Sequence, residues 1–218
     1  MKYKIVVFDM DGTLTRHVSS WQLIHEKLGM WDEDACRYQE QFLQGRISYR
    51  RFCELDAQRW KGVPAAVVVR HLLAIPYSRS VRQTLKKLKT LGFKLAIIST
   101  GLDLLALKVK KDLQIDHCLC NKLSVRHGRL TGQVKIDVAH GEKGKAFKRL
   151  LKKAGLKPEQ AIFVGDSATD VPAARIAGYA IAFNASHSEL AELADHNCST
   201  KDFREVFAAI TKANRSDD

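Results

Sequence analysis

Residues 3–13 read YKIVVFDMDGT, a run of mainly apolar residues that stops at two aspartates, Asp9 and Asp11. A strand that is covered on both faces of a parallel sheet has this kind of apolar run. Three further stretches repeat the pattern: KLAIIS at 94–99, AIFVG at 161–165 and YAIAF at 179–183. The opening stretch therefore predicts a buried strand with two like charges at its carboxyl end.

The intervals between most of these strands show the spacing of apolar residues that is typical of helices. Gly155 and Gly178 read as the glycines that end two of the helices. Alternating strands and helices predict an α/β fold with a doubly wound parallel sheet. One antiparallel hairpin is expected within it, because residues 123–134 alternate in polarity around a His-Gly turn. The clearest helical patterns lie at 102–113, 142–155 and 168–178.

Residues 15–77 depart from this alternation and read as helical throughout. We interpret the segment as a small helical bundle, here called the cap, that is inserted after the first strand and closes over its carboxyl end. The domain prediction is an α/β catalytic core of residues 1–14 and 78–218, with the cap at 15–77. The tryptophans of the cap are expected in its apolar core. The breaks between the cap helices fall at Gly29, Gly45 and Gly62-Val63-Pro64.

The charge of the chain raises the question of nucleic acid. The 218 residues carry a net charge of +12, and an excess of Lys and Arg can mark a nucleic-acid-binding protein. Most of these residues fall on the polar faces of the predicted helices, and no zinc-finger, basic-zipper or RNA-recognition pattern accompanies them. We therefore assign the charge to solvated helix faces that also attract small anions.

The cysteines and the hydropathy pattern favour a cytoplasmic protein without a membrane partner. The five cysteines are scattered and odd in number, which favours neither a disulfide framework nor a zinc knuckle. Cys118 and Cys120 alternate on one face of an apolar stretch and are expected to be buried. No apolar run approaches the roughly 18 residues of a membrane helix, and the early first strand leaves no room for a signal peptide.

Polar residues that follow three of the predicted strands are the candidates for chemistry. In a doubly wound sheet, residues at the carboxyl ends of neighbouring strands meet at one edge. Lys143 stands at the start of a helix that leads into one of these strands, so it can reach the same edge. The strand-end residues are Asp9, Asp11, Ser99, Thr100, Asp166 and Asp170.

The carboxylates among them suit a hard divalent cation. Asp9 and Asp166, completed by backbone oxygen and water, match the octahedral oxygen coordination that Mg²⁺ prefers. Asp170 can hold a metal-bound water. Without a cation, each like-charge pair at about 5 Å would cost on the order of 3 kcal/mol at an effective dielectric constant of about 20. The sequence therefore predicts a magnesium site.

A phosphate group would find its own ligands opposite the metal. Ser99, the backbone amide of Thr100 at a helix N-terminus and the ammonium of Lys143 would form an anion cradle. Nucleotide motifs are absent, since the sequence contains neither G-x-G-x-x-G nor G-x-x-x-x-G-K-[ST]. A calcium loop is excluded as well, because Gly12 and Thr13 do not match its pattern.

Two carboxylates one residue apart can take different roles. Asp9, beside the metal, can attack a phosphorus atom in line. Asp11 can give a proton to the leaving group and later recover it. Gly12 would allow a sharp turn and the hydroxyl of Thr13 would fix the loop. Under this hypothesis the reaction passes through an aspartyl phosphate.

The sequence resembles the haloacid dehalogenase superfamily in four ordered motifs: DMDGT at 9–13, the strand that ends at Ser99, Lys143, and GDSATD at 165–170. The position of the helical insert, the hairpin and the helices next to the last two motifs are similar to the phosphoserine phosphatase-like branch. The resemblance covers nearly the whole chain and implies a Mg²⁺-dependent phosphatase.

The resemblance also implies roles for single residues. Asp9 would be the nucleophile and Asp11 the acid/base, an acid that dehalogenases lack. The metal would be bound by Asp9, Asp166 and the backbone carbonyl of Asp11. The residues implied to hold phosphate or to lie near the substrate are Ser99, Lys143 and Thr169.

The chain differs from phosphoserine phosphatases at the two charges that hold the amino acid. Their Glu, nine residues after the nucleophile, is Val18 here, and their cap Arg aligns with about Asp56. We conclude that the protein is a phosphomonoester hydrolase for a small phosphorylated metabolite of open identity. The alternatives are a phosphotransferase or mutase of the same superfamily, or a basic nucleic-acid-binding protein on a phosphatase scaffold. The residues that could replace the missing charges are Arg16, His17, Arg50, Arg51 and Arg59.

Overall fold

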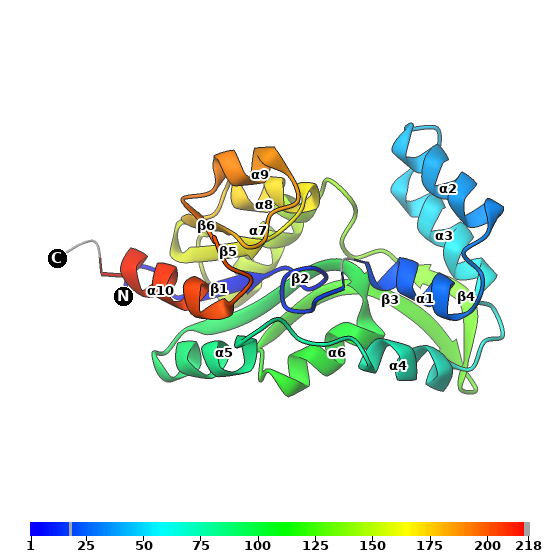
Figure 1. The fold of residues 1–218 in the computed structure, drawn as a ribbon, viewed down its shortest axis with the longest axis horizontal. Helices are drawn as coiled ribbons and strands as arrows, with labels where there is room; N and C mark the ends of the chain where they lie inside the picture. The colour runs from blue at the N-terminus through cyan, green and yellow to red at the C-terminus, as the bar shows by residue number, and fades with distance from the viewer. Residues whose placement is uncertain (18, 216–218) are drawn as a thin grey trace.

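The computed structural model describes residues 1–17 and 19–215. Its centre is a seven-stranded sheet in the order β4-β3-β2-β1-β5-β6-β7, with helices on both faces (Figure 1). All neighbouring strands run parallel except β3 and β4. The predicted α/β fold with a doubly wound sheet is therefore confirmed. The strands are β1 (Ile5–Phe8), β2 (Lys94–Leu102), β3 (His117–Arg126), β4 (Arg129–Lys135), β5 (Ala161–Gly165), β6 (Tyr179–Ala182) and β7 (His196–Asn197).

The helices fall into a group within residues 15–77 and a group that follows the strands of the sheet. The first group is α1 (Ser20–Lys27), α2 (Glu33–Leu43), α3 (Tyr49–Arg59) and α4 (Ala65–Leu73). The second group is α5 (Val81–Thr90), α6 (Asp103–Asp112), α7 (Lys143–Ala154), α8 (Val171–Ala174), α9 (Ser188–Leu193) and α10 (Phe203–Ala213). Two short 3₁₀ segments are η1 (Pro158–Gln160) and η2 (Ala168–Asp170).

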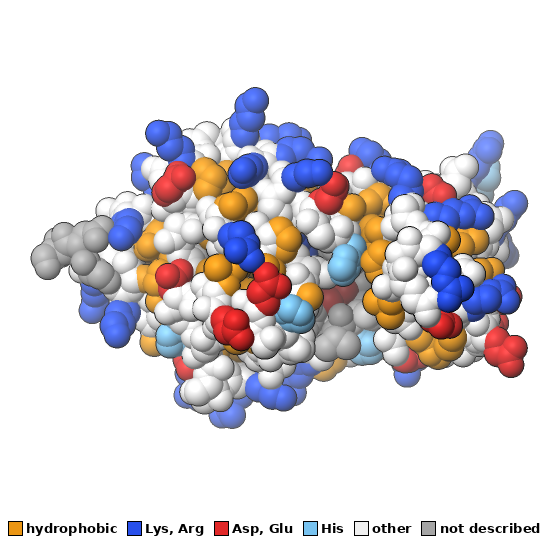
Figure 2. Space-filling view, turned by 90° about the horizontal axis from the view of Figure 1, so that it is seen from above, with side chains coloured by type: hydrophobic (Ala, Val, Ile, Leu, Met, Phe, Trp, Pro, Cys, Tyr) orange, Lys and Arg blue, Asp and Glu red, His pale blue; other side chains and the backbone are white. Residues whose placement is uncertain are grey.

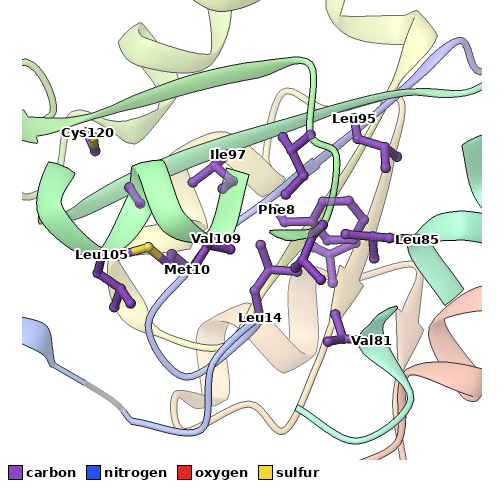
Figure 3. Packing of buried hydrophobic residues seen from close by; sticks show 14 of the residues in the cluster. Phe8, Met10, Leu14, Val81, Leu85, Leu95, Ile97, Leu105, Val109 and Cys120 are labelled. Carbon is purple, nitrogen blue, oxygen red and sulfur yellow. The ribbon is translucent and has the colours of Figure 1, made fainter. Parts of the chain in front are cut away.

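Strand β1 lies in the middle of the sheet, and its side chains alternate between two apolar cores. Val6 and Phe8 pack in the core that contains α5, α6 and α10, whereas Ile5 and Val7 pack in the core that contains α7, α8 and α9. Figure 3 shows Phe8 packed beside Leu85 of α5. Because both faces of β1 are buried, nearly every position in the strand is apolar, as the sequence shows.

The predicted hairpin is present, and it adds β4 to the edge of the sheet. The first half of β3 pairs with β2, and its second half pairs with β4. His127 and Gly128 form the turn with φ of 49° and 73°, and a two-residue turn of this kind needs positive φ at both positions. The hairpin also touches the cap, since the backbone N–H of Gly62 donates to the carbonyl of Leu130 over 2.8 Å.

Helices fill the segment predicted as the cap, and glycines separate them. Gly29, Gly45 and Gly62 follow α1, α2 and α3 with φ of 66°, 70° and 83°, values that L-residues with side chains rarely adopt. Trp21 and Trp60 are buried with ring centroids 5.2 Å apart, as expected of tryptophans in a cap core. Figure 1 shows α2 and α3 on one side of the β3–β4 end of the sheet, while α4 lies on the other side in line with α6 and α5.

The expectation of one helix at 168–178 capped by Gly178 was wrong. The helical residues are the 3₁₀ turn η2 followed by the single α-helical turn α8, which ends at Ala174. Gly178 does not have the positive φ of a capping glycine. A Cβ atom there would lie 2.2 Å from the carbonyl oxygen of Glu159, so close contact between backbones requires the glycine. Gly155, in contrast, ends α7 with φ of 69° as predicted.

The surface and the cysteines follow the predictions in part. Figure 2 shows Lys and Arg side chains scattered over one face instead of gathered in one patch. Cys120 is buried, whereas Cys118 is half-buried, and their sulfur atoms lie 3.9 Å apart. Among the described residues, no cysteine forms a disulfide. Within the same residues, no helix combines the length and the apolar character that crossing a membrane requires.

Candidate active site

Three strands deliver the predicted residues to one edge of the sheet. Strands β2, β1 and β5 are parallel neighbours, so their carboxyl ends lie side by side (Figure 1). Asp9 follows β1, Ser99 lies near the end of β2, and Asp166 follows β5. This is the edge at which doubly wound sheets bind their ligands.

Three carboxylates form an acidic cluster at this edge. Oxygen atoms of Asp9, Asp166 and Asp170 lie within 4.8 Å of one another, and all three side chains are buried. Burial and the charge of Asp170 raise the pKa of Asp9 well above its usual range, although Lys143 opposes this. Burial and the charge of Asp170 also raise the pKa of Asp166, to about 7. The cluster therefore favours a proton or a cation in its centre.

Lys143 is the positive charge within the cluster. It is the first residue of α7 and has no exposed surface. Its Nζ lies 2.8 Å from Asp9 Oδ1 and 2.5 Å from Asp170 Oδ1. Burial would lower the pKa of Lys143, but the charges of Asp170 and Asp9 outweigh it and raise the pKa above that of a free lysine. Lys143 is therefore a permanent cation held between two carboxylates.

Asp170 positions both Lys143 and the loop after β5. Its Oδ2 accepts hydrogen bonds from the backbone N–H groups of Asp166 and Ser167, each over 3.0 Å. Gly165 faces the same carboxyl group, and a Cβ atom there would lie 2.6 Å from Asp170 Oδ2. The predicted role of Asp170 with a metal-bound water stays a prediction, because these contacts alone already explain a buried aspartate.

Gly12 and Thr13 shape the loop against Asp166. Gly12 has φ of 84°, and a Cβ atom on it would lie 2.3 Å from Asp166 Oδ2. The hydroxyl of Thr13 donates to Asp166 Oδ1 over 2.8 Å. The loop after β1 is thereby fixed to the loop after β5, and no residue with a side chain fits at position 12 without displacing that carboxylate.

Asp11 points toward the cap. Its Oδ2 accepts hydrogen bonds from the hydroxyl of Ser20 over 2.7 Å and from the backbone N–H of Ser20 over 2.9 Å. Burial raises the pKa of Asp11, and the two bonds from Ser20 partly offset the rise. The sequence reasoning missed Ser20, although two serines directly before the apolar pattern of α1 are a common signal for a helix start.

The structure corrects the expected position of Thr100. The sequence placed its backbone amide at a helix N-terminus, but β2 continues through Leu102 and α6 begins only at Asp103. The carbonyl of Thr100 holds the strand in place by accepting three side-chain hydrogen bonds. Ser99 is buried, and its Oγ accepts from the backbone N–H of Gly101 over 2.9 Å. The donors to Thr100 are Trp21 Nε1, Tyr49 Oη and Asn121 Nδ2.

The remaining predicted substrate contacts lie in different places. Thr169 is half-buried, with its Oγ1 3.0 Å from Ser167 Oγ. Asp56 is buried in the cap, where its Oδ1 lies 3.2 Å from Nε2 of the equally buried His25. Position 56 therefore supplies no cation to the site. Val18 lies outside the described residues.

The residues considered as substitutes for the missing charges lie in separate places. Arg59 pairs with Asp32 and Asp34 on the cap surface, and Arg51 lies 3.8 Å from Glu54. The others are spread over the surface and the loop after β1. Arg16 lines a cleft of about 460 Å³ beside Gly12, His17 is half-buried, and Arg50 is exposed.

Comparison with known proteins identifies the family. The family model for haloacid dehalogenase-like hydrolases matches residues 6–175. The chain is 32% identical over 199 residues to the phosphoserine phosphatase of Archaeoglobus fulgidus. The aligned region covers 90% of this chain and 56% of the relative. The chain is also 29% identical over 210 residues to the phosphoserine phosphatase of Methanocaldococcus jannaschii. That aligned region covers 96% of this chain and 98% of the relative.

A solved structure of similar fold supports the same family assignment. A structure described as the phospho-aspartyl intermediate analogue of phosphoserine phosphatase superposes with a TM-score of 0.81 at 28% identity, over 96% of this chain and 99% of that one. The chain thus spans just over half of the Archaeoglobus relative but nearly the full length of the solved structure. By its motifs, its fold and the family model, the chain belongs to the haloacid dehalogenase-like hydrolase family.

Proposed function

We propose that the protein is a phosphomonoester hydrolase that acts through Asp9 on a small phosphorylated metabolite. The observation that carries the proposal is the buried contact between Asp9 and Lys143, which orients one carboxylate oxygen of Asp9 beside a fixed positive charge. Such an arrangement suits a nucleophile that accepts a phosphoryl group. The similarity to phosphoserine phosphatases supports the same reaction class.

The cluster fits Mg²⁺ as its cofactor. Its donors are carboxylate oxygens, which Mg²⁺ prefers, and the raised pKa values of Asp9 and Asp166 show that the cluster needs positive charge. Asp9, Asp166 and the backbone carbonyl of Asp11 would hold the ion. When bound, Mg²⁺ would offset negative charge on the phosphoryl oxygens.

The reaction would proceed in two steps. Asp9 attacks phosphorus, the bond to the leaving oxygen breaks, and Asp11 gives its proton to that oxygen. Asp11, now ionised, then takes a proton from a water molecule that attacks the phosphorylated Asp9 and releases phosphate. Ser99 and Lys143 would bind the phosphoryl oxygens throughout. Helices α1–α4 of residues 15–77 would cover the site as a cap.

Hydrolysis of a generic aryl phosphate tests this function. The purified protein is expected to release phosphate in the presence of Mg²⁺ and to stop when EDTA is added in excess. Undiminished release with the metal fully chelated would refute the metal-dependent mechanism. Adding candidate alcohols and searching for a new phosphoester distinguishes hydrolysis from phosphoryl transfer.

Mg²⁺ is expected to stabilise the folded protein more at about pH 8 than at about pH 5. The pKa of Asp166 is raised from 3.8 to about 7, so the folded protein holds an extra proton between these values and loses stability as the pH rises through them. A bound cation replaces that proton. Thermal unfolding with Mg²⁺ or EDTA should therefore show a difference that grows to roughly 5 °C at the higher pH.

Asp166→Asn provides the control for this experiment, since it removes the titrating group and one proposed metal ligand together. The variant should lose the dependence of the Mg²⁺ effect on pH. An equal Mg²⁺ effect at both pH values in the unaltered protein would contradict the proposed site.

Phosphoserine is expected to have no advantage over phosphomonoesters of similar size that lack its charges. The structure provides no cation at position 56, because Asp56 lies buried beside His25. A panel of phosphorylated metabolites, compared by kcat/KM, measures the preference. A kcat/KM for phosphoserine more than about tenfold above the rest of the panel, equivalent to about 1.4 kcal/mol, would show that another part of the chain recognises the amino acid.

A further inference from the structure

Ser20 joins Asp11 to the cap. Its hydroxyl and its backbone N–H both donate to Asp11 Oδ2, over 2.7 Å and 2.9 Å. Ser20 has no exposed surface, and it is the first residue of α1, the first helix of the cap. One carboxylate oxygen of Asp11 is therefore held entirely by a residue that belongs to the cap.

The other carboxylate oxygen of Asp11 accepts no hydrogen bond from the described residues. Asp11 Oδ1 is buried and has no hydrogen-bond partner among the described residues. Buried acceptors are usually paired, so an exception needs an explanation. A role as general acid explains the exception, because a proton on Oδ1 can pass to a leaving oxygen without breaking any hydrogen bond inside the protein.

The core leaves just enough space for this pair. A Cβ atom on Gly101 would lie 2.7 Å from Asp11 Oδ2 and 2.8 Å from Ser20 Oγ. Gly101 does not have positive φ, so its backbone would accept alanine and the conflict concerns only the added atom. Asp11 Oδ2 is thus enclosed by the cap on one side and by the end of β2 on the other.

We propose that Ser20 is the positioning residue of the acid/base Asp11, holding Oδ2 so that Oδ1 stays available for proton transfer and tying that geometry to the placement of α1. This inference rests on the proposed phosphatase function and assigns Ser20 a part in it. Ser20 touches neither the phosphoryl group nor the metal in this scheme, so it acts only through Asp11.

The role of Ser20 has a specific signature. An alkyl leaving group needs the proton of Asp11, whereas nitrophenolate leaves without it. Loss of the Ser20 hydroxyl should therefore slow leaving-group release from alkyl substrates selectively.

Ser20→Ala tests this signature with two substrates. We expect the single-turnover rate of alcohol release from an alkyl phosphate to fall about tenfold to a hundredfold, part of the roughly 10²- to 10⁴-fold that a general acid contributes, because Asp11 itself remains. Release of nitrophenolate in the same assay should change less than about threefold, because this first step does not use the proton of Asp11. Ser19→Ala is the matched control, because Ser19 Oγ accepts from the backbone N–H of Gln22 at the start of the same helix and does not contact Asp11. Its ratio of the two rates should equal that of the unaltered protein.

Gly101→Ala provides a second variant that disturbs the same pair from the side of the core. It should show the same selective loss on alkyl phosphates, and it decides the question if Ser20→Ala does not fold. Equal losses of leaving-group release on both substrates, or no loss at all, would overturn the role of Ser20. Failure of the unaltered protein to hydrolyse either substrate would refute the phosphatase function itself, and the proposal with it.

Discussion

Asp9→Asn is expected to lower Mg²⁺-dependent phosphate release from an aryl phosphate by at least about 10³-fold. The amide of asparagine cannot attack phosphorus, and the substitution also removes a negative charge that faces Lys143 at 2.8 Å. Initial rates of the purified variant and of the unaltered protein, at saturating Mg²⁺, measure the effect.

Loss of activity in this variant should not reflect loss of folding. Burial raises the pKa of Asp9, so removing its charge relieves a desolvation cost, and Lys143 keeps its contact with Asp170. The melting temperature should therefore change little. Asp34→Asn serves as the control, because Asp34 lies on the cap surface in an ion pair with Arg37. Substantial turnover by Asp9→Asn, with the control unaffected, would rule out Asp9 as the nucleophile.

Lys143→Met is expected to produce the largest loss of stability, about 3–5 kcal/mol in the absence of metal. The substitution keeps most of the side-chain volume but leaves Asp9 and Asp170 buried without their cation. Removing one partner of a buried ion pair costs more than the pair contributes, because the other charge stays uncompensated. Urea-induced unfolding in EDTA measures the difference.

The cost of Lys143→Met should depend on pH. At low pH Asp9 takes up a proton, so the stability of the variant should move toward that of the unaltered protein. Lys145→Met is the matched control in the same helix, since the Lys145 side chain is 80% exposed and pairs with Glu142 at the surface. A loss below about 1 kcal/mol for Lys143→Met would mean that the buried pair does not hold the cluster together.

The parts of the fold that a sequence can predict are those with local signals. The apolar run before Asp9 predicted the central strand because both faces of β1 are buried. The His-Gly turn predicted the hairpin because residues 127 and 128 need positive φ. The ordered strand-end motifs predicted which carboxylates would meet, because parallel strands place their carboxyl ends together.

Errors arose where a distant contact decided the local structure. Thr100 belongs to a strand end, not a helix start, because side chains of the cap and of β3 bind its carbonyl. Gly178 resembles a helix cap in sequence, but its small size serves a contact with Glu159. Neither partner is near in sequence, so no local pattern could reveal them.

The sequence by itself determined the α/β fold, the family and the set of acidic residues at the sheet edge, because each follows from strand order and short motifs. Only the tertiary structure showed which of these residues contact each other. Lys143 lies between Asp9 and Asp170, and Ser20 of the cap donates a hydrogen bond to Asp11. Those contacts join segments that a local pattern cannot relate, and their chemistry depends on burial. Desolvation and the charge of Asp170 raise the pKa of Asp166 to about 7, whereas the same residue exposed on a loop would be an ordinary carboxylate.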